Sequence, residues 1–248
     1  MTTIIDAGDP LAVAATEAVQ RGDLTRLRQL LAEHPELASA AIGTAGPAGK
    51  TRTLLHAATD WPSHYANVAA TIGVLVDAGA DVNARFTGPH TETPLHWAAS
   101  SDDVAALDAL LDAGADIEAD GAVIAGGTPL DDAVAFAQWH TARRLVERGA
   151  RTSLGSAAAL GLLDRLRDHL ATNPPAEEIT AALWAACHGG QQATAELLLQ
   201  RGAELNWITP WDGLTPLDTA RRSNADDLAA WLITRGARSA TESGPAAN

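Results

Sequence analysis

Apolar residues recur at helical spacing in short, regularly placed segments of the chain. In one segment Val104, Leu107, Leu110 and Leu111 fall at positions i, i+3, i+6 and i+7, which places them on one stripe of a helix. Gly114 follows and suits the left-handed turn that ends many helices. Because so short a helix cannot bury its stripe alone, the pattern predicts helices that stack on their neighbours.

The same glycine recurs, each time followed by alanine and a polar residue. The intervals between its copies are 35, 35, 53 and 34 residues, and the longest indicates either one long unit or a degenerate unit between residues 151 and 201. A block that begins with threonine precedes four of the copies. Threonine can cap a helix N-terminus, and a following proline loses no hydrogen bond in the first turn. The glycine motifs lie at residues 79–81, 114–116, 149–151, 202–204 and 236–238, and the threonine blocks at 53–56, 93–96, 128–131 and 215–218.

The clearest unit resembles the ankyrin repeat. It reads Thr-Pro-Leu-His at 93–96, continues with Ala98 and Ala99, and closes with Gly-Ala-Asp at 114–116. The resemblance implies an all-α fold, an ankyrin-repeat solenoid of about seven stacked helix-turn-helix units. It also implies a stand-alone protein of the bacterial type, in a family known chiefly for binding.

The resemblance and the spacing together predict a single ankyrin-repeat domain at residues 1–238. A divergent N-terminal cap is expected at about 10–35. A degenerate repeat is expected at about 154–171, where both the Thr-Pro-Leu start and the Gly-Ala end are missing. The tail at 239–248 has nothing to bury and is expected to be disordered. The other repeats are expected near 53–84, 93–119, 128–151, 179–206 and 215–238.

Charge and composition narrow the classes of partner. The chain has 17 Lys+Arg and 31 Asp+Glu, a net charge of −14, whereas a nucleic-acid-binding protein needs a basic stripe. We therefore expect no nucleic-acid partner and a protein or peptide partner that is basic or neutral. One cysteine, no basic region before an apolar stretch at the N-terminus and no long apolar run predict a cytoplasmic protein with no membrane partner.

Residues 43–51, Gly-Thr-Ala-Gly-Pro-Ala-Gly-Lys-Thr, come close to a phosphate-binding P-loop. Their spacing misses that motif by one residue, and no apolar strand precedes them. We therefore expect a flexible linker between the first two repeats and no nucleotide site.

Histidine and cysteine show no pattern typical of a metal site. His56 and His96 end two of the threonine blocks, and aspartate replaces them in two others, which argues against a shared metal. The family resemblance implies that these histidines join loops by hydrogen bonds, and we expect no metal and no cofactor. Cys187 is expected to be a buried small hydrophobe; the alternative is a nucleophile activated by His188.

Candidate binding residues follow from the resemblance. It implies that partners contact the two residues after the alanine pair and the hairpin tips before each threonine block. Interfaces are rich in aromatic residues, and two groups combine these with ionisable side chains. The group in repeats 2–4, which includes an insertion at 60–65, contains Asp60, Trp61, His64, Tyr65, His90, Glu92 and Phe136. The group in repeats 6–7 contains Trp184, His188, Trp207, Trp211 and Asp212.

The tryptophans divide into two classes. Trp97, Trp139, Trp184 and Trp231 occupy helix positions that favour packing in the core. For Trp61 and Trp211, a functional and a structural role are equally consistent with the sequence.

Two functions remain open. The leading interpretation is a non-enzymatic interaction protein that binds a protein or peptide partner on its concave face. The alternative is a small-molecule binder or enzyme with a pocket in repeats 2–4, for hydrolysis or for acid–base chemistry in natural-product tailoring. In that case Asp60 or Glu92 would be the general base and His64 or His90 its acid–base partner, without a metal. A closed pocket with a converging carboxylate and imidazole would favour the alternative, and an open stripe across three repeats the first interpretation.

Overall fold

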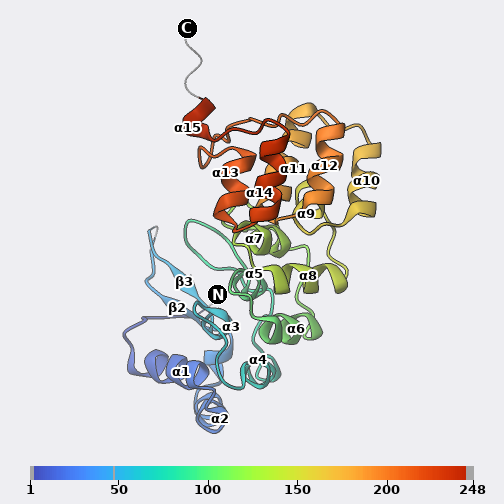
Figure 1. The fold of residues 1–248 in the computed structure, drawn as a ribbon. Coiled ribbons are helices and arrows are strands. Elements are labelled where there is room, and N and C mark those ends of the chain that lie inside the picture. The colour runs from blue at the N-terminus through green and yellow to red at the C-terminus, as the bar shows by residue number, and fades with distance from the viewer. Residues whose placement is uncertain (1–2, 47, 244–248) are drawn as a thin grey trace. The chain divides into compact units, whose positions relative to one another are not determined.

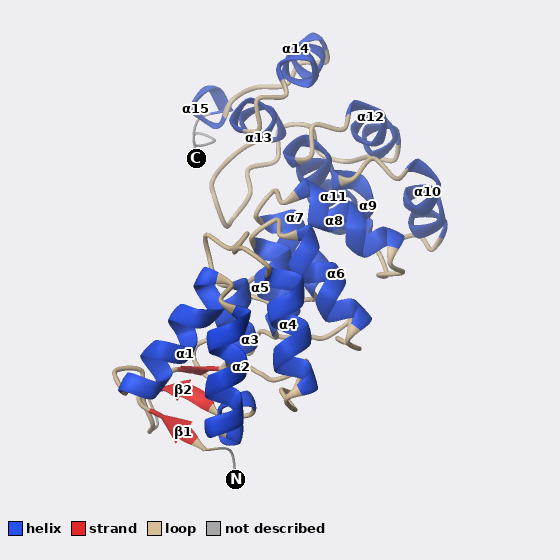
Figure 2. Cartoon of the chain, turned by 90° about the horizontal axis from the view of Figure 1, so that it is seen from below, coloured by secondary structure: helices blue, strands red, loops and turns tan. Residues whose placement is uncertain are grey.

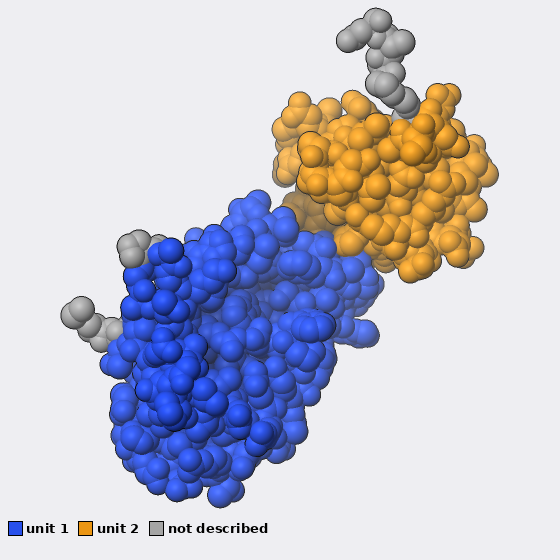
Figure 3. Space-filling model, turned by 90° about the vertical axis from the view of Figure 1, so that its left-hand side faces the viewer, with its two compact units in different colours: residues 1–150 blue, residues 151–248 orange. Residues whose placement is uncertain are grey.

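The computed structural model describes residues 3–46 and 48–243 of the chain. The chain divides into two compact units, residues 1–150 and residues 151–248, called unit 1 and unit 2 below (Figure 3). Helices dominate both units. The described strands belong to one small sheet near the N-terminus, shown in red in Figure 2.

Unit 1 contains four helix pairs, in each of which a second helix follows the first after a short connection (Figure 1). A short 3₁₀ helix, Pro35–Ala38, follows the first pair. The pairs are α1 (Pro10–Arg21) with α2 (Leu24–Glu33), α3 (Leu54–Thr59) with α4 (Val68–Asp77), α5 (Pro94–Ser100) with α6 (Val104–Asp112), and α7 (Pro129–Ala135) with α8 (Trp139–Glu147).

Unit 2 contains three further pairs and a short final helix. None of the helices in the described part of the chain is long and apolar enough to cross a membrane. The elements are α9 (Leu154–Ala159) with α10 (Leu163–Ala171), α11 (Ala176–His188) with α12 (Gln192–Gln200), α13 (Pro216–Arg222) with α14 (Asp226–Thr234), and α15 (Ala240–Ser243).

Each threonine block lies at the start of the first helix of a pair, as the sequence predicts. Thr53, Thr93 and Thr128 form capping boxes, in which the threonine hydroxyl binds the third backbone N–H and the third side chain binds back to the threonine N–H. Ser153 does the same for α9, where the sequence has no threonine block. Each box satisfies two backbone N–H groups that a helix start otherwise leaves without partners.

Small and branched residues fill the space between the helices. Leu95, Ala98 and Ala99 of α5 are fully buried, as are Leu107 and Leu110 of α6. Helix α5 packs against both α3 and α7, and alanine at this seam lets the helix backbones approach closely. The stacking of short helix pairs that the sequence predicts is therefore confirmed in unit 1.

The two ends of the expected flexible linker, Gly43 and Thr51, are paired in a three-stranded sheet. Strands β2 (Ala41–Gly43) and β3 (Thr51–Arg52) are antiparallel, and β1 (Ile4–Ile5) pairs in parallel with β2. Thr51 also exchanges two backbone hydrogen bonds with Thr87, of 3.0 and 2.9 Å. These backbone hydrogen bonds order Gly43 and Thr51, which the composition alone assigns to a loop.

The predicted disordered tail also begins with ordered structure. The Ser239 N–H donates to the Glu242 carboxylate over 2.9 Å, and the Ala240 N–H donates to Asp218 Oδ2 over 2.7 Å. These bonds anchor α15 to the start of α13, so residues 239–243 are helical or capped. Residues 244–248 of that prediction lie outside the described residues.

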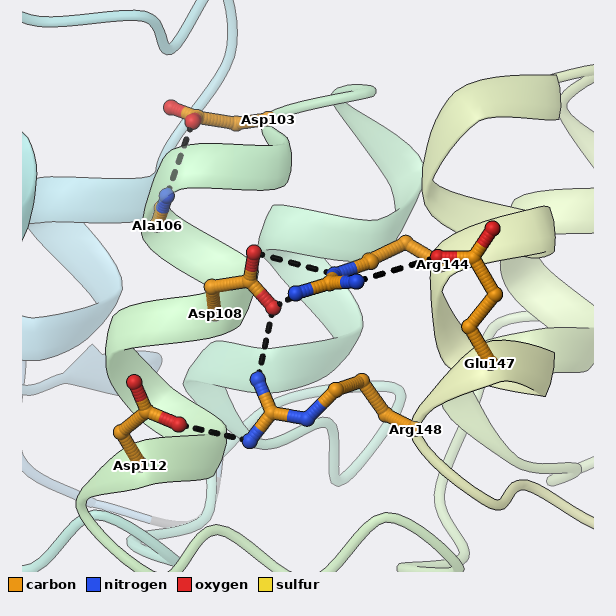
Figure 4. A network of polar contacts seen from close by, with 7 residues as sticks. All are labelled: Asp103, Ala106, Asp108, Asp112, Arg144, Glu147 and Arg148. Carbon is orange, nitrogen blue, oxygen red and sulfur yellow. Dashed lines mark hydrogen bonds and ion pairs between the residues drawn. The ribbon is translucent and has the colours of Figure 1, made fainter.

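Ion pairs join the second helices of neighbouring pairs (Figure 4). Asp108 of α6 accepts hydrogen bonds from Arg144 Nε at 2.8 Å and Arg148 Nη1 at 2.6 Å, both on α8. Arg148 also pairs with Asp112 at 2.7 Å, and Arg144 with Glu147 at 3.0 Å. Burial acts to raise the pKa of Asp108, but the two arginines outweigh it and the pKa is lowered. The network fixes α8 against α6.

Candidate functional site

The C-terminal ends of α3, α5 and α7 frame an open pocket of about 320 Å³ in unit 1, called the Trp61 pocket below. Its aromatic walls come from three consecutive helix pairs. Trp61 and Phe136 are 79% and 45% exposed, so large apolar surface faces solvent here. Besides two serines, the pocket is lined by Asp60, Trp61, Trp97, Val123, Phe136 and Gln138.

The insertion that carries Trp61 is bound to the next helix pair. Asp60 ends α3 and forms an ion pair with Arg52 of β3. Ser63 Oγ and the His64 N–H both donate to Asp103 Oδ2, over 2.7 and 2.9 Å. Asp103 also caps α6, so the loop that presents Trp61 is fixed at both ends.

His64 and Tyr65 have structural contacts. His64 Nε2 is 3.1 Å from the backbone oxygen of Ser101, to which it donates a hydrogen bond. Burial, and then the charge of Asp60, raise the pKa of Tyr65, whose hydroxyl also bonds to Gln20. Neither side chain lines the Trp61 pocket.

Glu92 is buried next to the Trp61 pocket and is not among its lining residues. Its side chain is buried, and burial raises its pKa, while a hydrogen bond from the Trp97 side chain and the nearby His90 act in the opposite direction. Its backbone oxygen accepts a 3.1 Å hydrogen bond from His56 Nε2. Glu92 therefore lies beside Trp97 and does not itself line the pocket.

The four acid–base candidates do not converge at this pocket. Of Asp60, His64, His90 and Glu92, only Asp60 is among the described residues that line it. Its carboxylate is paired with Arg52, and the described lining contains no imidazole. The observed geometry lacks the carboxylate–imidazole pair that the enzymatic alternative requires.

Trp97 lines the site although the sequence places it in the core. It is half-buried, and its ring lies 4.9 Å from that of His56 and 5.5 Å from that of Phe86. Trp139, Trp184 and Trp231 are also half-buried, and Trp231 packs against the hydrophobic core of unit 2, as the sequence predicts. For Trp97, the available signal was a tryptophan at a position where the resemblance implies leucine.

Asp132 is a second residue that sequence reasoning missed. It is 1% exposed, and its Oδ1 has no hydrogen-bond partner in the described structure. Burial, and then the charge of Glu92, raise its pKa to about 7, although the backbone N–H groups of Ile124 and Val123 favour the ionised form. Asp132 therefore lies next to the backbone of Val123, which lines the Trp61 pocket.

A second pocket, of about 420 Å³, lies beside the β2–β3 hairpin. Lys50 and Arg52 line it together with Glu17, Phe86 and Trp97, so Trp97 separates the two pockets. The P-loop-like segment thus contributes the single lysine of the chain to a pocket wall.

In unit 2 the structure brings the second predicted group together. The Trp184 and His188 rings are stacked at 5.1 Å, and Trp211 lies 5.3 Å from both Trp184 and Trp207. The Arg222 guanidinium lies 5.8 Å from the Trp184 ring and pairs with Asp212 at 2.9 Å. Trp211 is 56% exposed and forms the outer part of this cluster.

The other singled-out residues have structural roles. His56 and His96 bond through Nε2 to the backbone oxygens of Glu92 and Gly127, which confirms that they join loops, and burial lowers the pKa of each to about 4. Burial raises the pKa of Cys187 to about 12, which disfavours a thiolate nucleophile. Among residues 3–46 and 48–243 there is no cluster of three or more His, Cys, Asp or Glu suited to a metal ion.

Comparison with known proteins places the fold in a family. Residues 15–121 match the family described as ankyrin repeats (3 copies), and residues 180–210 match the ankyrin repeat. An ankyrin repeat and KH domain-containing protein from Caenorhabditis briggsae is 30% identical over 178 residues, which is 67% of this chain but only 6% of that protein. The crystal structure of the human ASB11 ankyrin repeat domain is 22% identical, with a TM-score of 0.53 over 90% of this chain and 97% of that one. The two family matches together span more than half of the chain, which therefore belongs to the ankyrin repeat family.

Proposed function

We propose that the chain binds a protein or peptide partner on the face formed by the first helices of unit 1, the concave face of the solenoid. Ankyrin repeats generally mediate protein–protein interactions. The observation that carries the proposal is the Trp61 pocket, whose aromatic residues come from three consecutive repeats. A partner that crosses these repeats covers Trp61 and Phe136 at once.

The exposure of these side chains gives the proposal its energetic basis. Binding energy at protein interfaces concentrates in a few large residues, tryptophan prominent among them, that become desolvated at the centre of the contact. Trp61 is 79% exposed and is held on a loop fixed by Ser63 and Asp103. Burying a presented indole costs little loop entropy, so Trp61 is the expected centre of the interface.

The aromatic cluster of unit 2 supplies a further contact in this proposal. Trp211 is exposed above Trp184, and the ion pair between Asp212 and Arg222 fixes its loop. His188, stacked on Trp184, supports the cluster from beneath.

The test begins with peptides selected by phage display against the immobilised chain. Fluorescence anisotropy then gives the Kd of each selected peptide for the chain and its variants. We expect Trp61→Ala and Phe136→Ala each to weaken binding at least tenfold. Ile233→Ala is the matched control, because Ile233 is an exposed apolar residue on α14, and its Kd should stay within twofold.

Two results would count against this function. If the selected peptides bind the Trp61→Ala and Phe136→Ala variants as tightly as they bind the original chain, this face of unit 1 is not the binding site. A metabolite that quenches tryptophan fluorescence, loses affinity with Trp61→Ala and displaces the peptides would favour the small-molecule alternative.

A further inference from the structure

Three aromatic side chains line the open Trp61 pocket. Trp61, Trp97 and Phe136 all line its volume of about 320 Å³, and each is on a different helix pair. The faces of aromatic rings carry negative electrostatic potential, and rings that enclose a space attract an organic cation into it. An uncharged aliphatic side chain bound in the same pocket would gain only apolar contact with the rings.

Trp97 is preorganised as the inner wall. Its ring lies 4.9 Å from that of His56 and 5.5 Å from that of Phe86, and its side chain lies beside the buried Glu92. These contacts fix the indole before any ligand arrives, so its immobilisation does not oppose binding. Trp61 and Phe136, both exposed, form the outer walls.

Asp60 places a carboxylate at the rim. Arg52 engages Oδ2, Oδ1 accepts no hydrogen bond among the described contacts, and Asp60 lines the pocket. A cation on a flexible alkyl stem can therefore meet ring faces and one carboxylate oxygen together. Arg52 partly neutralises Asp60, so the rings supply most of the attraction.

The charge of the surrounding unit favours the same sign of ligand. Residues 1–150 contain 20 Asp+Glu and 9 Lys+Arg, whereas residues 151–248 contain 11 and 8. Two arginines of unit 1 are already paired with carboxylates, Arg52 with Asp60 and Arg85 with Asp120. A positively charged segment is drawn to unit 1 more than to unit 2.

We propose that the Trp61 pocket binds the guanidinium or ammonium side chain of an arginine or lysine in the partner. This specificity rests on the proposed function, because it requires a peptide on this face of unit 1. The cation lies between the three rings, its stem contacts Val123, and Asp60 accepts its hydrogen bond. The bound chemistry is a monovalent organic cation on an alkyl stem.

The experiment uses four small probes with the full chain: the Nα-acetyl methylamides of arginine, lysine, citrulline and norleucine. Citrulline nearly matches arginine in shape but carries no charge, and norleucine is the uncharged alkyl control for lysine. Indole N–H signals in ¹H–¹⁵N NMR spectra, assigned from Trp→Phe variants, report which tryptophans respond. We expect the arginine or lysine probe to shift the Trp61 and Trp97 signals, with its neutral counterpart at least fivefold weaker.

Variants then test the residues. Trp61→Ala should lower the affinity for the charged probe at least fivefold, and Asp60→Asn should lower that affinity by a smaller factor. Trp231→Ala is the matched control: Trp231 already has Arg235 at 4.3 Å over its ring, in unit 2, and its loss should leave the probe affinity unchanged. Far-UV circular dichroism checks that each variant is folded.

The outcomes distinguish failure of the cation specificity from failure of the proposed peptide-binding function. Equal binding of the citrulline and arginine probes, or no shift at Trp61 and Trp97 with any probe, overturns the cation specificity. If selected peptides still depend on Trp61 in that case, the peptide-binding function stands. If a charged probe binds at Trp61 while no selected peptide does, the proposed function fails.

Discussion

At the scale of single residues, burial has opposite consequences for acids and for histidines in unit 1. The pKa of Asp132 is raised to about 7, whereas the pKa values of His56 and His96 are lowered to about 4. Both shifts favour the neutral form because a charge is costly in a poorly hydrated interior. Their effects on stability therefore oppose each other across the range from pH 4 to pH 7.

The first prediction concerns Asp132→Asn. The folded state binds the Asp132 proton more tightly than the unfolded state does. The contribution of Asp132 to the free energy of unfolding is therefore present at low pH and is lost as pH rises towards 7. We expect the variant to gain stability relative to the original chain between pH 4 and pH 8, by on the order of 2 kcal/mol. Urea unfolding at several pH values measures the difference, and a constant difference would contradict the shift.

The second prediction concerns the two block histidines. The Nδ1 atom of each accepts a hydrogen bond from the backbone N–H of the capping threonine, and Nε2 binds a backbone oxygen, so the neutral ring suits both sites. In NMR titrations we expect His56 and His96 to protonate with midpoints near pH 4. Their contribution to stability should be lost as pH falls from about 6.5 towards 4. A midpoint above pH 6 for either ring would contradict the burial argument.

At the scale of elements, glycines at helix ends and inside helices have opposite roles. Gly22 follows α1 with φ at +64°, and a Cβ there would collide with the backbone oxygen of Ala66. Gly73, inside α4, has no atom within 4 Å of such a Cβ. We expect Gly22→Ala to cost roughly 2 kcal/mol or more, and Gly73→Ala to add up to about 1 kcal/mol. Thermal unfolding of the two variants gives the comparison, and shifts of the same sign would refute it.

The ion pairs between α6 and α8 permit a similar matched test. Asp108 bonds to two arginines of the next repeat, whereas the side chain of Asp164 is 96% exposed and is paired with Arg167 one turn away. We expect Asp108→Asn to lower the free energy of unfolding by about 1–2 kcal/mol and Asp164→Asn by less than about 0.5 kcal/mol. Equal losses in chemical unfolding would show that the shared carboxylate adds nothing.

At the scale of the whole molecule, the charge asymmetry between the units predicts salt-dependent association. A cationic peptide selected against the chain should associate more slowly as ionic strength rises, because exposed charges are screened. We expect stopped-flow association rates to fall at least fivefold between 20 mM and 300 mM salt, with a smaller change in dissociation. Salt-independent rates would show that the acidity of unit 1 does not guide the partner.

The sequence determined most of the fold. Threonine blocks, alanine pairs and closing glycines act within a few residues, so capping and helical periodicity can be predicted without tertiary information. Even the degenerate block at 154–171 forms α9 and α10, because Ser153 caps as threonine does. The order at Thr51 and the helix at 240–243 were missed because they depend on hydrogen bonds between residues far apart in sequence, Thr51 with Thr87 and Ala240 with Asp218.

The sequence by itself also singled out Asp60, Trp61 and Phe136 as candidates, since each occupies a repeat position that faces a partner in this family. Only the tertiary structure placed them in one pocket with Trp97, and only it bound His64 to the next repeat and buried Glu92. The reason is physical: repeat position fixes a residue's direction on its own helix. Whether it reaches a pocket, a hydrogen-bond partner or the interior depends on neighbours that only stacking supplies.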